Sequence, residues 1–451
     1  MKGIFIFLLQ LIVSQKVIIF DAGSSGTRIH LYEYTNSSDP ANFSACIDKN
    51  QKPVTSSIKI PLANALNNNT IMKSIIDPLL NYIGNYSTLE EKKSISIILY
   101  ATAGMRKLNK SDQEIILNDC YDYITKNYEY KASRNEFRVI EGYEEAMFAW
   151  ISVNRLVSHF DDRNLTIPIF EIGGASAQIA TEQSDLDQDV SPYTHNVSIG
   201  NKNFKVFCHS WLGFGYDDAM GILHKNILDT GSYETPCALT GSTLTLKLPD
   251  RKSVSFYGKV NFSKCYSMFS DIVYKQDQNC GKYKCTFTNV PLSNDFIHRK
   301  EMYGMGVVTY SADFLQLPPS MNVSVFRKKA EEFSALTYQE ALDKYYNYAY
   351  LNDTLPQQIV SLNFMERGLF SVSNLILKAP KKINGVEPQW TLGAILAARS
   401  PGVIVHPKDH SIKPWIYVAA VSVVMIGGLL VFLLIRRSRN SIGVITKPLI
   451  I

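Results

Sequence analysis

Two apolar stretches of this chain end in the same way, in an acid followed by a glycine-rich turn. The first, VIIFDAGSSGTRI, has Asp21 after the apolar run and Gly23 two residues later. The second, PIFEIGGASAQIA, has Glu171 and Gly173 in the matching places, about 150 residues further along. Glycine lets a backbone approach a phosphate closely and point several N–H groups at it. The repeat therefore favours folds in which two strand ends face each other across a phosphate site.

The acids in these turns suit a metal ion better than a phosphate. Asp21 and Glu171 are negative and would repel phosphate, whereas Mg²⁺ or Ca²⁺ binds carboxylate oxygens and waters. The hydroxyls of Ser24, Ser25 and Thr27 add donors for phosphate oxygens. Either turn alone is also an ordinary connector after a strand. Together they predict a cleft that holds a polyphosphate and its cation.

Two further stretches fit such a cleft. LYATAGMRKL is a strand-like run that ends in Thr102, Ala103 and Gly104, although a plain strand-to-helix turn would look the same. VIEGYEEAMFAW places Glu144 and Glu145 at the start of an expected helix. Acids in a first helical turn usually just interact favourably with the helix dipole. The functional alternative is a general base that orients water for attack on a terminal phosphorus.

The chain of 451 residues is long enough for two or three domains, and strand-like runs alternate with helix-like ones, which predicts an α/β class. Its composition, 46% hydrophobic and 19% charged, is that of a folded protein. The formal net charge of +5 is a weak excess, and no basic stripe carries interleaved aromatic residues. The sequence therefore gives no support for nucleic-acid binding.

Two apolar segments predict the compartment. Residues 1–15 resemble a secretory signal peptide, with an uncleaved signal anchor as the alternative. Residues 415–435 contain no charge and are followed by RRSR, as expected for one transmembrane helix with its C-terminal end in the cytosol. We expect residues 401–414 to form a stalk and residues 436–451 a cytosolic tail. The body would then face the secretory lumen or the cell exterior.

Sequons and cysteines agree with that compartment. All the Asn-X-Ser/Thr sequons lie on the predicted extracytoplasmic side, at Asn36, Asn42, Asn68, Asn85, Asn109, Asn164, Asn196, Asn261, Asn322 and Asn352. The 7 cysteines predict disulfides with one thiol left over, and Cys280 and Cys285 are close enough to close a small loop. Metal binding by cysteine is the weaker interpretation, because no Cys-X-X-Cys pair or His cluster accompanies them.

Five stretches resemble, in order and spacing, the conserved regions of the nucleoside triphosphate diphosphohydrolase (apyrase) family: IIFDAGSSGTRIHLYEY, LYATAGMRKL, VIEGYEEAMFAWISVN, FEIGGASAQIA and PQWTLGAILAA. HSWLGFG looks more like the family's nucleoside-diphosphatase branch, and the C-terminal anchor more like its cell-surface branch. The resemblance implies a two-lobed actin, sugar-kinase and Hsp70-like (ribonuclease H-like) fold with the active site in the interlobe cleft. We expect the N-terminal lobe at residues 16–141, completed by about 393–400, and the C-terminal lobe at residues 142–392.

The resemblance also implies roles for individual residues. The expected catalytic base is Glu145, and the residues expected to place the attacking water are Ser176 and Gln178. Asp21 and Glu171 would reach Ca²⁺ or Mg²⁺ through water. The phosphate-binding residues would be Ser24, Ser25, Gly26, Thr27, Thr102, Ala103, Gly104, Gly173, Gly174 and Ala175. Tyr310 lies in a stretch resembling the base-stacking region, with a core aromatic as the alternative. Trp390 would be structural.

The expected activity is divalent-cation-dependent hydrolysis of the terminal phosphate of nucleoside tri- or diphosphates by a directly attacking water. Two positions depart from the family pattern: Glu171 stands where Asp is usual, and Ala177 where Thr is common. An added methylene shifts a carboxylate, and misplacement near 1 Å can cost about 10²-fold in rate. The alternatives are a catalytically weak nucleotide-binding membrane glycoprotein, acting as a receptor or adhesion domain, and an exopolyphosphatase or kinase of the same superfamily.

Overall fold

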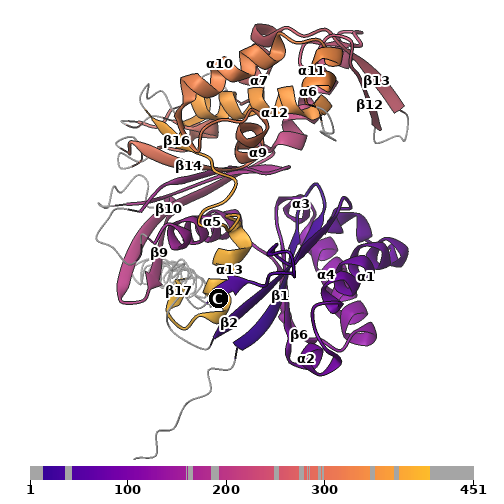
Figure 1. Ribbon diagram of the computed structural model, residues 1–451, viewed down its shortest axis with the longest axis vertical. Coiled ribbons are helices and arrows are strands. Elements are labelled where there is room, and N and C mark those ends of the chain that lie inside the picture. The colour runs from indigo at the N-terminus through magenta and orange to yellow at the C-terminus, as the bar shows by residue number, and fades with distance from the viewer. Residues whose placement is uncertain are drawn as a thin grey trace, which may run out of the picture. The chain divides into compact units, whose positions relative to one another are not determined.

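The computed structural model describes residues 14–35, 43–158, 160, 166–183, 192–247, 253–273, 279–281, 283, 285–292, 296, 299–345, 351–369 and 375–406. Of the predicted stalk, residues 401–414, the part from residue 407 on lies outside these residues. The predicted transmembrane helix and tail, and residues 1–13 of the predicted signal peptide, also lie outside them. Within the described ranges, no helix combines the length and the apolar character needed to span a membrane. The account below concerns the body, residues 14–406 (Figure 1).

The first sheet contains the first glycine-rich turn. Its strand order is β3-β2-β1-β5-β6, with β4 also pairing with β2. The strands are β1 (Ser14–Ala22), β2 (Thr27–Thr35), β3 (Phe43–Ala45), β4 (Thr55–Ile58), β5 (Ser96–Ala101) and β6 (Lys131–Val139). The helices that follow them are α1 (Asn69–Gly84), α2 (Leu89–Ser94), α3 (Ala103–Arg106) and α4 (Lys110–Asn127). Apolar residues of α1 and α4, such as Ile76 and Ile116, share one buried cluster with Phe20 and Leu99 of the strands.

The second sheet contains the second glycine-rich turn and has the order β15-β16-β14-β7-β8-β10-β9-β17. Its strands are β7 (Ile169–Ile172), β8 (Ser176–Glu182), β9 (Thr194–Ile199), β10 (Lys202–Leu212), β14 (Glu301–Gly306), β15 (Ser320–Asn322), β16 (Ile376–Lys378) and β17 (Val403–Val405). Its covering helices are α6 (Tyr216–Asp229), α7 (Phe262–Val273), α9 (Val307–Phe314), α10 (Val323–Ser334), α11 (Tyr338–Lys344) and α12 (Leu351–Asn363). A small sheet, β11-β13-β12, adjoins α6 and comprises β11 (Glu234–Thr235), β12 (Thr243–Lys247) and β13 (Ser253–Gly258).

The two sheets repeat one arrangement around their turns. In the first sheet, β1 pairs antiparallel with β2 and parallel with β5. In the second, β7 pairs antiparallel with β8 and parallel with β14. Buried parallel strands read as continuous apolar runs, which is why VIIF and PIF lack a polar alternation. The internal repeat seen in the sequence is therefore a repeat of topology.

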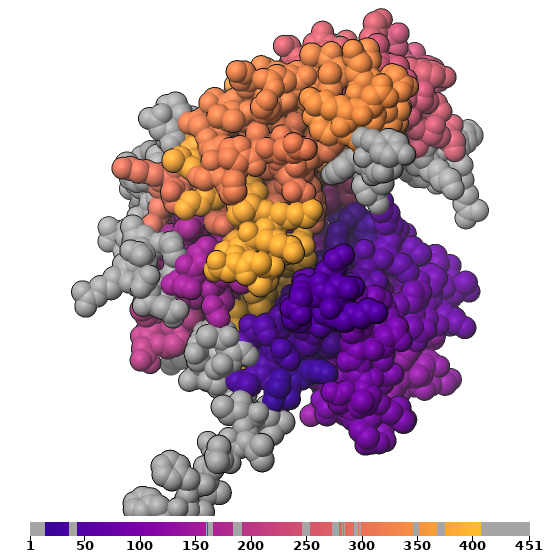
Figure 2. Space-filling view, viewed as in Figure 1, coloured from indigo at the N-terminus to yellow at the C-terminus, as the bar shows by residue number. Residues whose placement is uncertain are grey.

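Two helices join the sheets: α5 (Gly142–Leu156) and α13 (Trp390–Arg399). Their apolar faces share one buried cluster with Ile19 of the first sheet and Val197 of the second. They cross so closely that a Cβ on Gly393 would lie 1.9 Å from the backbone oxygen of Phe148. In the space-filling view, the yellow part of the body lies between the indigo and the orange parts of the chain (Figure 2). Both helices pack against both sheets, so their packing does not assign them to one lobe. The lobe boundaries at residues 141 and 392 therefore stay a prediction.

The cysteines differ from expectation. Within the described residues, disulfides join Cys237 to Cys265 and Cys280 to Cys285, which confirms the small predicted loop. The prediction that a single thiol is left over is wrong, because Cys46, Cys120 and Cys208 are all buried free thiols. Cys46 lies just after β3, Cys120 on α4 and Cys208 on β10. Each packs as a small apolar side chain.

Candidate active site

The two glycine-rich turns are hairpins of the same construction. The N–H of Gly23 donates to the backbone oxygen of Gly26 at 3.0 Å, and the N–H of Gly173 donates to that of Ser176 at 2.9 Å. Gly174 lies where the two turns approach each other: a Cβ added there would be 2.5 Å from the Ser24 hydroxyl oxygen. Any larger residue at this position would require the Ser24 hydroxyl to move. The two turns therefore sit within contact distance of each other.

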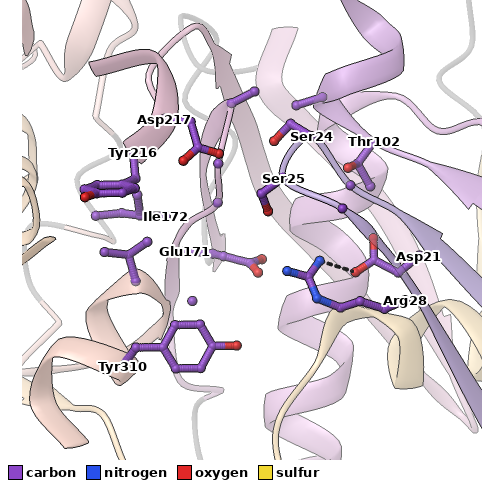
Figure 3. A pocket seen from close by; sticks show the side chains of 18 of the residues that line it. Asp21, Ser24, Ser25, Arg28, Thr102, Glu171, Ile172, Tyr216, Asp217 and Tyr310 are labelled. Carbon is purple, nitrogen blue, oxygen red and sulfur yellow. Dashed lines mark hydrogen bonds and ion pairs between the residues drawn. The ribbon is translucent and has the colours of Figure 1, made fainter. Parts of the chain in front are cut away.

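Between the turns lies a pocket of about 470 Å³. Residues from both sheets line it, and Figure 3 labels ten of them. The predicted site residues among the lining are Asp21, Ser24, Ser25, Gly26, Thr102, Ala103, Glu145, Glu171, Gly173, Gly174, Ala175, Ser176 and Tyr310. Trp390, predicted to be structural, is buried and also reaches the pocket. Segments far apart in the chain thus meet where the sequence placed a cleft.

Three predicted site residues do not line this pocket. Thr27 is fully buried, and its hydroxyl donates to the backbone oxygen of Ile60 at 3.0 Å. Gly104 packs under the first turn, where a Cβ would lie 2.8 Å from the Cα of Ser24. Gln178 is fully buried, and its Nε2 atom donates to the hydroxyl of Ser176, which does line the pocket. Thr27 and Gly104 shape the first turn from behind rather than presenting groups to a ligand.

Asp21 has a cationic partner within its own hairpin. The hairpin register places Arg28 opposite Asp21, and Arg28 Nη1 donates to Asp21 Oδ2 at 3.2 Å. Burial raises the pKa of Asp21 above its ordinary value, while Arg28 opposes that rise. Figure 3 shows the guanidinium of Arg28 lying between the carboxylates of Asp21 and Glu171. Arg28 was missed in the sequence, although the turn length alone sets the pairing of residues 21 and 28.

Glu171 has no such partner. Its register neighbour is Gln178, and among the described residues no hydrogen-bond donor reaches its buried Oε2 atom. Burial, together with the nearby charges of Glu145 and Asp21, raises the pKa of Glu171 to about 8. An unpaired buried carboxylate is costly unless a proton or a cation neutralises it. The side chain points into the pocket, toward Arg28 (Figure 3).

Glu145 is held by an arginine that the sequence analysis did not single out. Arg106 Nη2 donates to Glu145 Oε2 at 2.8 Å and to Ser176 Oγ at 3.3 Å. Gln178 Nε2 donates to the same Ser176 oxygen at 2.5 Å and to Ser210 Oγ at 3.2 Å. Burial raises the pKa of Glu145, and Arg106 counteracts this shift. The three predicted catalytic residues thus form one connected cluster around Arg106.

Other lining residues carried no clear sequence signal. Asp217 lies in the first turn of α6, after the HSWLGFG stretch, and a Cβ on Gly174 would lie 2.4 Å from its Oδ2 atom. Lys59, Tyr216 and Asp353 also line the pocket. They come from separate elements and meet only in the folded chain. Tyr310 is 44% exposed and is therefore not the core aromatic of the alternative interpretation.

The donor set suits a hydrated divalent cation. Four pocket carboxylates, those of Asp21, Glu145, Glu171 and Asp217, have raised pKa values because of burial, and Glu171 keeps its unpaired oxygen. Within the described part of the chain, no three His, Cys, Asp or Glu side chains are grouped closely enough to hold a metal directly. Mg²⁺ commonly keeps several waters and uses one or two carboxylates. The residues present therefore fit a cation bound largely through water.

The pocket is lined by two glycine-rich turns of the kind that bind phosphate, and by buried carboxylates. These features are typical of enzymes that act on phosphate esters or anhydrides. The chain belongs to the GDA1/CD39 (nucleoside phosphatase) family, whose model matches residues 13–404. This confirms the family resemblance and the prediction of a nucleoside phosphatase.

Relatives and a solved structure agree with this membership. The Golgi apyrase of Schizosaccharomyces pombe is 26% identical, over 87% of this chain and 77% of the relative. The guanosine-diphosphatase of the same yeast is 27% identical, over 86% and 74%. A nucleoside triphosphate hydrolase structure from Neospora caninum matches with a TM-score of 0.58 at 14% identity, covering 86% of this chain and 93% of that one. That structural match supports a shared mixed α/β fold.

Proposed function

We propose that this chain hydrolyses the terminal phosphate anhydride of nucleoside tri- or diphosphates, using a directly attacking water and a Ca²⁺ or Mg²⁺ ion. One observation carries the proposal. Glu145 is buried at a pocket between two glycine-rich turns, in contact with Arg106 and beside Ser176. A general base must lie within reach of the water it activates, and the pocket offers Glu145 as such a base.

The attacking water would lie between Glu145 and the terminal phosphorus. Ser176 and Gln178 place it, since Gln178 donates to Ser176 and fixes the direction of that hydroxyl. Glu145 takes one proton from the water as the new oxygen–phosphorus bond forms. The bond from phosphorus to the bridging oxygen breaks, and the leaving phosphate keeps its electron pair.

The turns supply the charge stabilisation. The backbone N–H groups of Gly174 and Ala175, with the hydroxyls of Ser24 and Ser25, would bind the phosphoryl oxygens, while the N–H of Gly173 closes the turn that presents them. Thr102 and Ala103 line the same space. Asp21 and Glu171 would hold the cation through water, and the cation would neutralise developing charge on the phosphates. Tyr310 lines the pocket and is half-exposed, and it would stack on the nucleobase.

The rest of the predicted organisation belongs to the same proposal. The two sheets form the lobes of an actin, sugar-kinase and Hsp70-like fold, with the pocket in the cleft between them. A signal peptide and one transmembrane helix at residues 415–435 would place the body in the secretory lumen or outside the cell. Relatives named Golgi apyrase and ectonucleoside triphosphate diphosphohydrolase support this compartment.

A phosphate-release assay tests the proposal. ATP, ADP, UDP, GDP and polyphosphate are each supplied with Ca²⁺ or Mg²⁺, and again with excess chelator. We expect release from nucleotides that chelator abolishes and that Glu145→Gln lowers by about 10²–10⁴-fold. Nucleotide binding without release would favour a receptor or adhesion protein, and release from polyphosphate alone an exopolyphosphatase. Glu145→Gln with full activity would refute the base assignment.

A further inference from the structure

A second arginine–glutamate pair lies beside the pair that holds the proposed base. Arg138 on β6 donates from Nη1 to Glu144 Oε2 at 2.8 Å and from Nη2 to Glu144 Oε1 at 2.9 Å. Glu144 precedes Glu145 directly, yet it does not line the pocket. The paired bonds of a planar guanidinium fix both the distance and the orientation of a carboxylate. Arg138 therefore fixes the residue next to Glu145 in more than one direction.

This contact acts where α5 is weakest. The first turn of a helix has backbone N–H groups without helical partners. Glu144 Oε2 also accepts the backbone N–H of Glu141, the residue before the helix, at 2.8 Å. One carboxylate thus joins the start of α5 to β6 and caps the helix. Without Arg138, the first turn of α5 would keep its cap but lose the link from Glu144 to β6.

Arg138 is itself fixed by packing. Its guanidinium lies over the ring of Tyr100 on β5, 4.4 Å from the ring centroid. Tyr100 is buried and stacks on Phe148 of α5, with centroids 6.3 Å apart. Phe148 lies one helical turn beyond Glu144. Two residues after Tyr100, Thr102 lines the pocket. Arg138 therefore connects α5 to the strand that also carries one wall of the site.

The opposite side of the same turn rests on the second sheet. A Cβ on Gly142, the first residue of α5, would lie 2.5 Å from the Cβ of Ser210 on β10. Ser210 in turn accepts a hydrogen bond from Gln178. The start of α5 is therefore held by Arg138, by Ser210 and by Arg106, which donates to the backbone oxygen of Ile140 at 3.2 Å. Loss of Arg138 would remove the contact at Glu144 and let that part of the first turn shift.

We propose that Arg138, acting through Glu144, is a positioning residue that sets the direction of the Glu145 carboxylate. The inference rests on the proposed function, in which Glu145 activates the water. Arg138 touches neither pocket nor substrate, so its removal should lower kcat and leave KM unchanged. A residue that merely stabilised the fold would change the melting temperature without this split.

The test compares Arg138→Lys with Arg134→Lys in the full-length protein. Arg134 is the matched control, because it lies on the same strand and forms an ion pair with Glu114 of α4, away from the pocket. Misplacement of a catalytic group by about 1 Å can cost about 10²-fold in rate, so we expect Arg138→Lys to lower kcat by at least about tenfold. KM and the pH dependence of kcat should stay unchanged. Arg134→Lys should keep the parent kcat.

Glu144→Gln provides a second variant if Arg138→Lys does not fold. It should give the same fall in kcat, and the double variant should be no slower than the slower single one, because both changes break one contact. Parent-like kcat in either single variant, a change confined to KM, or additive losses would overturn the inference. Glu145→Gln is assayed in parallel: if it keeps full activity, the proposed base is wrong, which separates that failure from this one.

Discussion

The two glycine-rich hairpins have the same backbone arrangement but differ in the residue that lies opposite the acid. In the first hairpin, the register pairs Asp21 with Arg28, and the two form an ion pair at 3.2 Å. In the second, the same position pairs Glu171 with Gln178, which instead donates to Ser176. The first carboxylate is therefore neutralised by the chain itself. The second has only the nearby charge of Arg28, without a hydrogen bond among the described residues, and is otherwise neutralised by a proton or a cation that enters the pocket.

This difference assigns different tasks to equivalent positions. The first hairpin is complete in the folded chain, because its cation is built in. In the second hairpin, Gln178 donates to the Ser176 hydroxyl and orients it. The carboxylate of Glu171 is therefore left without a hydrogen-bond donor from the opposite strand. A protein that needs an added cation must keep some negative charge unsatisfied until that cation binds. Glu171 is the group in this pocket that meets this condition.

The largest effect on activity should come from adding a side-chain atom where the two hairpins meet. In Gly174→Ala, the new Cβ would lie 2.4 Å from Asp217 Oδ2 and 2.5 Å from Ser24 Oγ, so both of these pocket side chains would have to move. We expect phosphate release to fall by about 10²-fold or more. Gly173→Ala is the control, because its nearest contact is at 3.4 Å and neither glycine has a positive φ. Equal losses in both variants would contradict the proposed approach of the hairpins.

The next largest effect should come from making the first hairpin resemble the second. Arg28→Gln removes the charge that lowers the pKa of both Asp21 and Glu171. Both carboxyls then hold protons to higher pH, so cation-dependent activity should fall about tenfold at neutral pH and recover toward alkaline pH. Arg28→Lys, which keeps the charge, should show a smaller shift. A pH profile of kcat/KM that matches the parent would show that Arg28 does not tune these acids.

A smaller effect concerns stability. The pKa of Glu171 is about 8 in the folded protein, against an ordinary value of 4.5. Between these pH values the unfolded chain binds fewer protons, so the free energy of unfolding falls as pH rises, until about pH 8. Glu171→Gln removes this loss. In chelator, the variant should melt at a higher temperature than the parent above pH 8, and at a similar temperature below pH 4.5. Equal melting curves at both pH values would refute the unpaired state of Glu171.

The smallest expected effect on activity comes from Thr27, which lies behind the first turn, and it is compared with that of Ser25, which lines the pocket. Thr27→Val removes a hydroxyl that donates to Ile60, outside the pocket, so it should cost about 1 kcal/mol of stability and leave activity within about twofold. Ser25→Ala removes a hydroxyl from the pocket lining and should lower activity about tenfold. A larger activity loss in Thr27→Val than in Ser25→Ala would show that Thr27 reaches the phosphate.

The sequence predicted the parts of the site that depend on local pattern. An acid, one residue and a glycine after an apolar run suffice to place Asp21 and Glu171 at equivalent strand ends. The partner of Asp21 was also within reach, because a closed turn between Gly23 and Gly26 sets Arg28 opposite it. The contact from Arg106 to Glu145 was not, since it joins α3 to a helix almost forty residues later and depends on the packing of both.

The misses have a common physical cause. The cysteine prediction assumed that thiols in an oxidising compartment pair, but Cys46, Cys120 and Cys208 are buried in the core as free thiols. Exposure of Tyr310 likewise depends on which elements surround α9. Local patterns determine the conformation of a turn, whereas tertiary packing determines which side chains surround it.

The crossing of α5 and α13 also constrains the order in which the chain can assemble. Tyr32 of β2 hydrogen-bonds Thr391 of α13 at 2.9 Å, and Arg399 at the end of α13 forms an ion pair with Glu136 of β6. The first sheet is made early during synthesis, yet its packing partner emerges from the ribosome almost last. A nascent chain must therefore keep an unfinished apolar surface for most of its synthesis. Truncation before residue 390 should leave a chain that depends on chaperones rather than a smaller working enzyme.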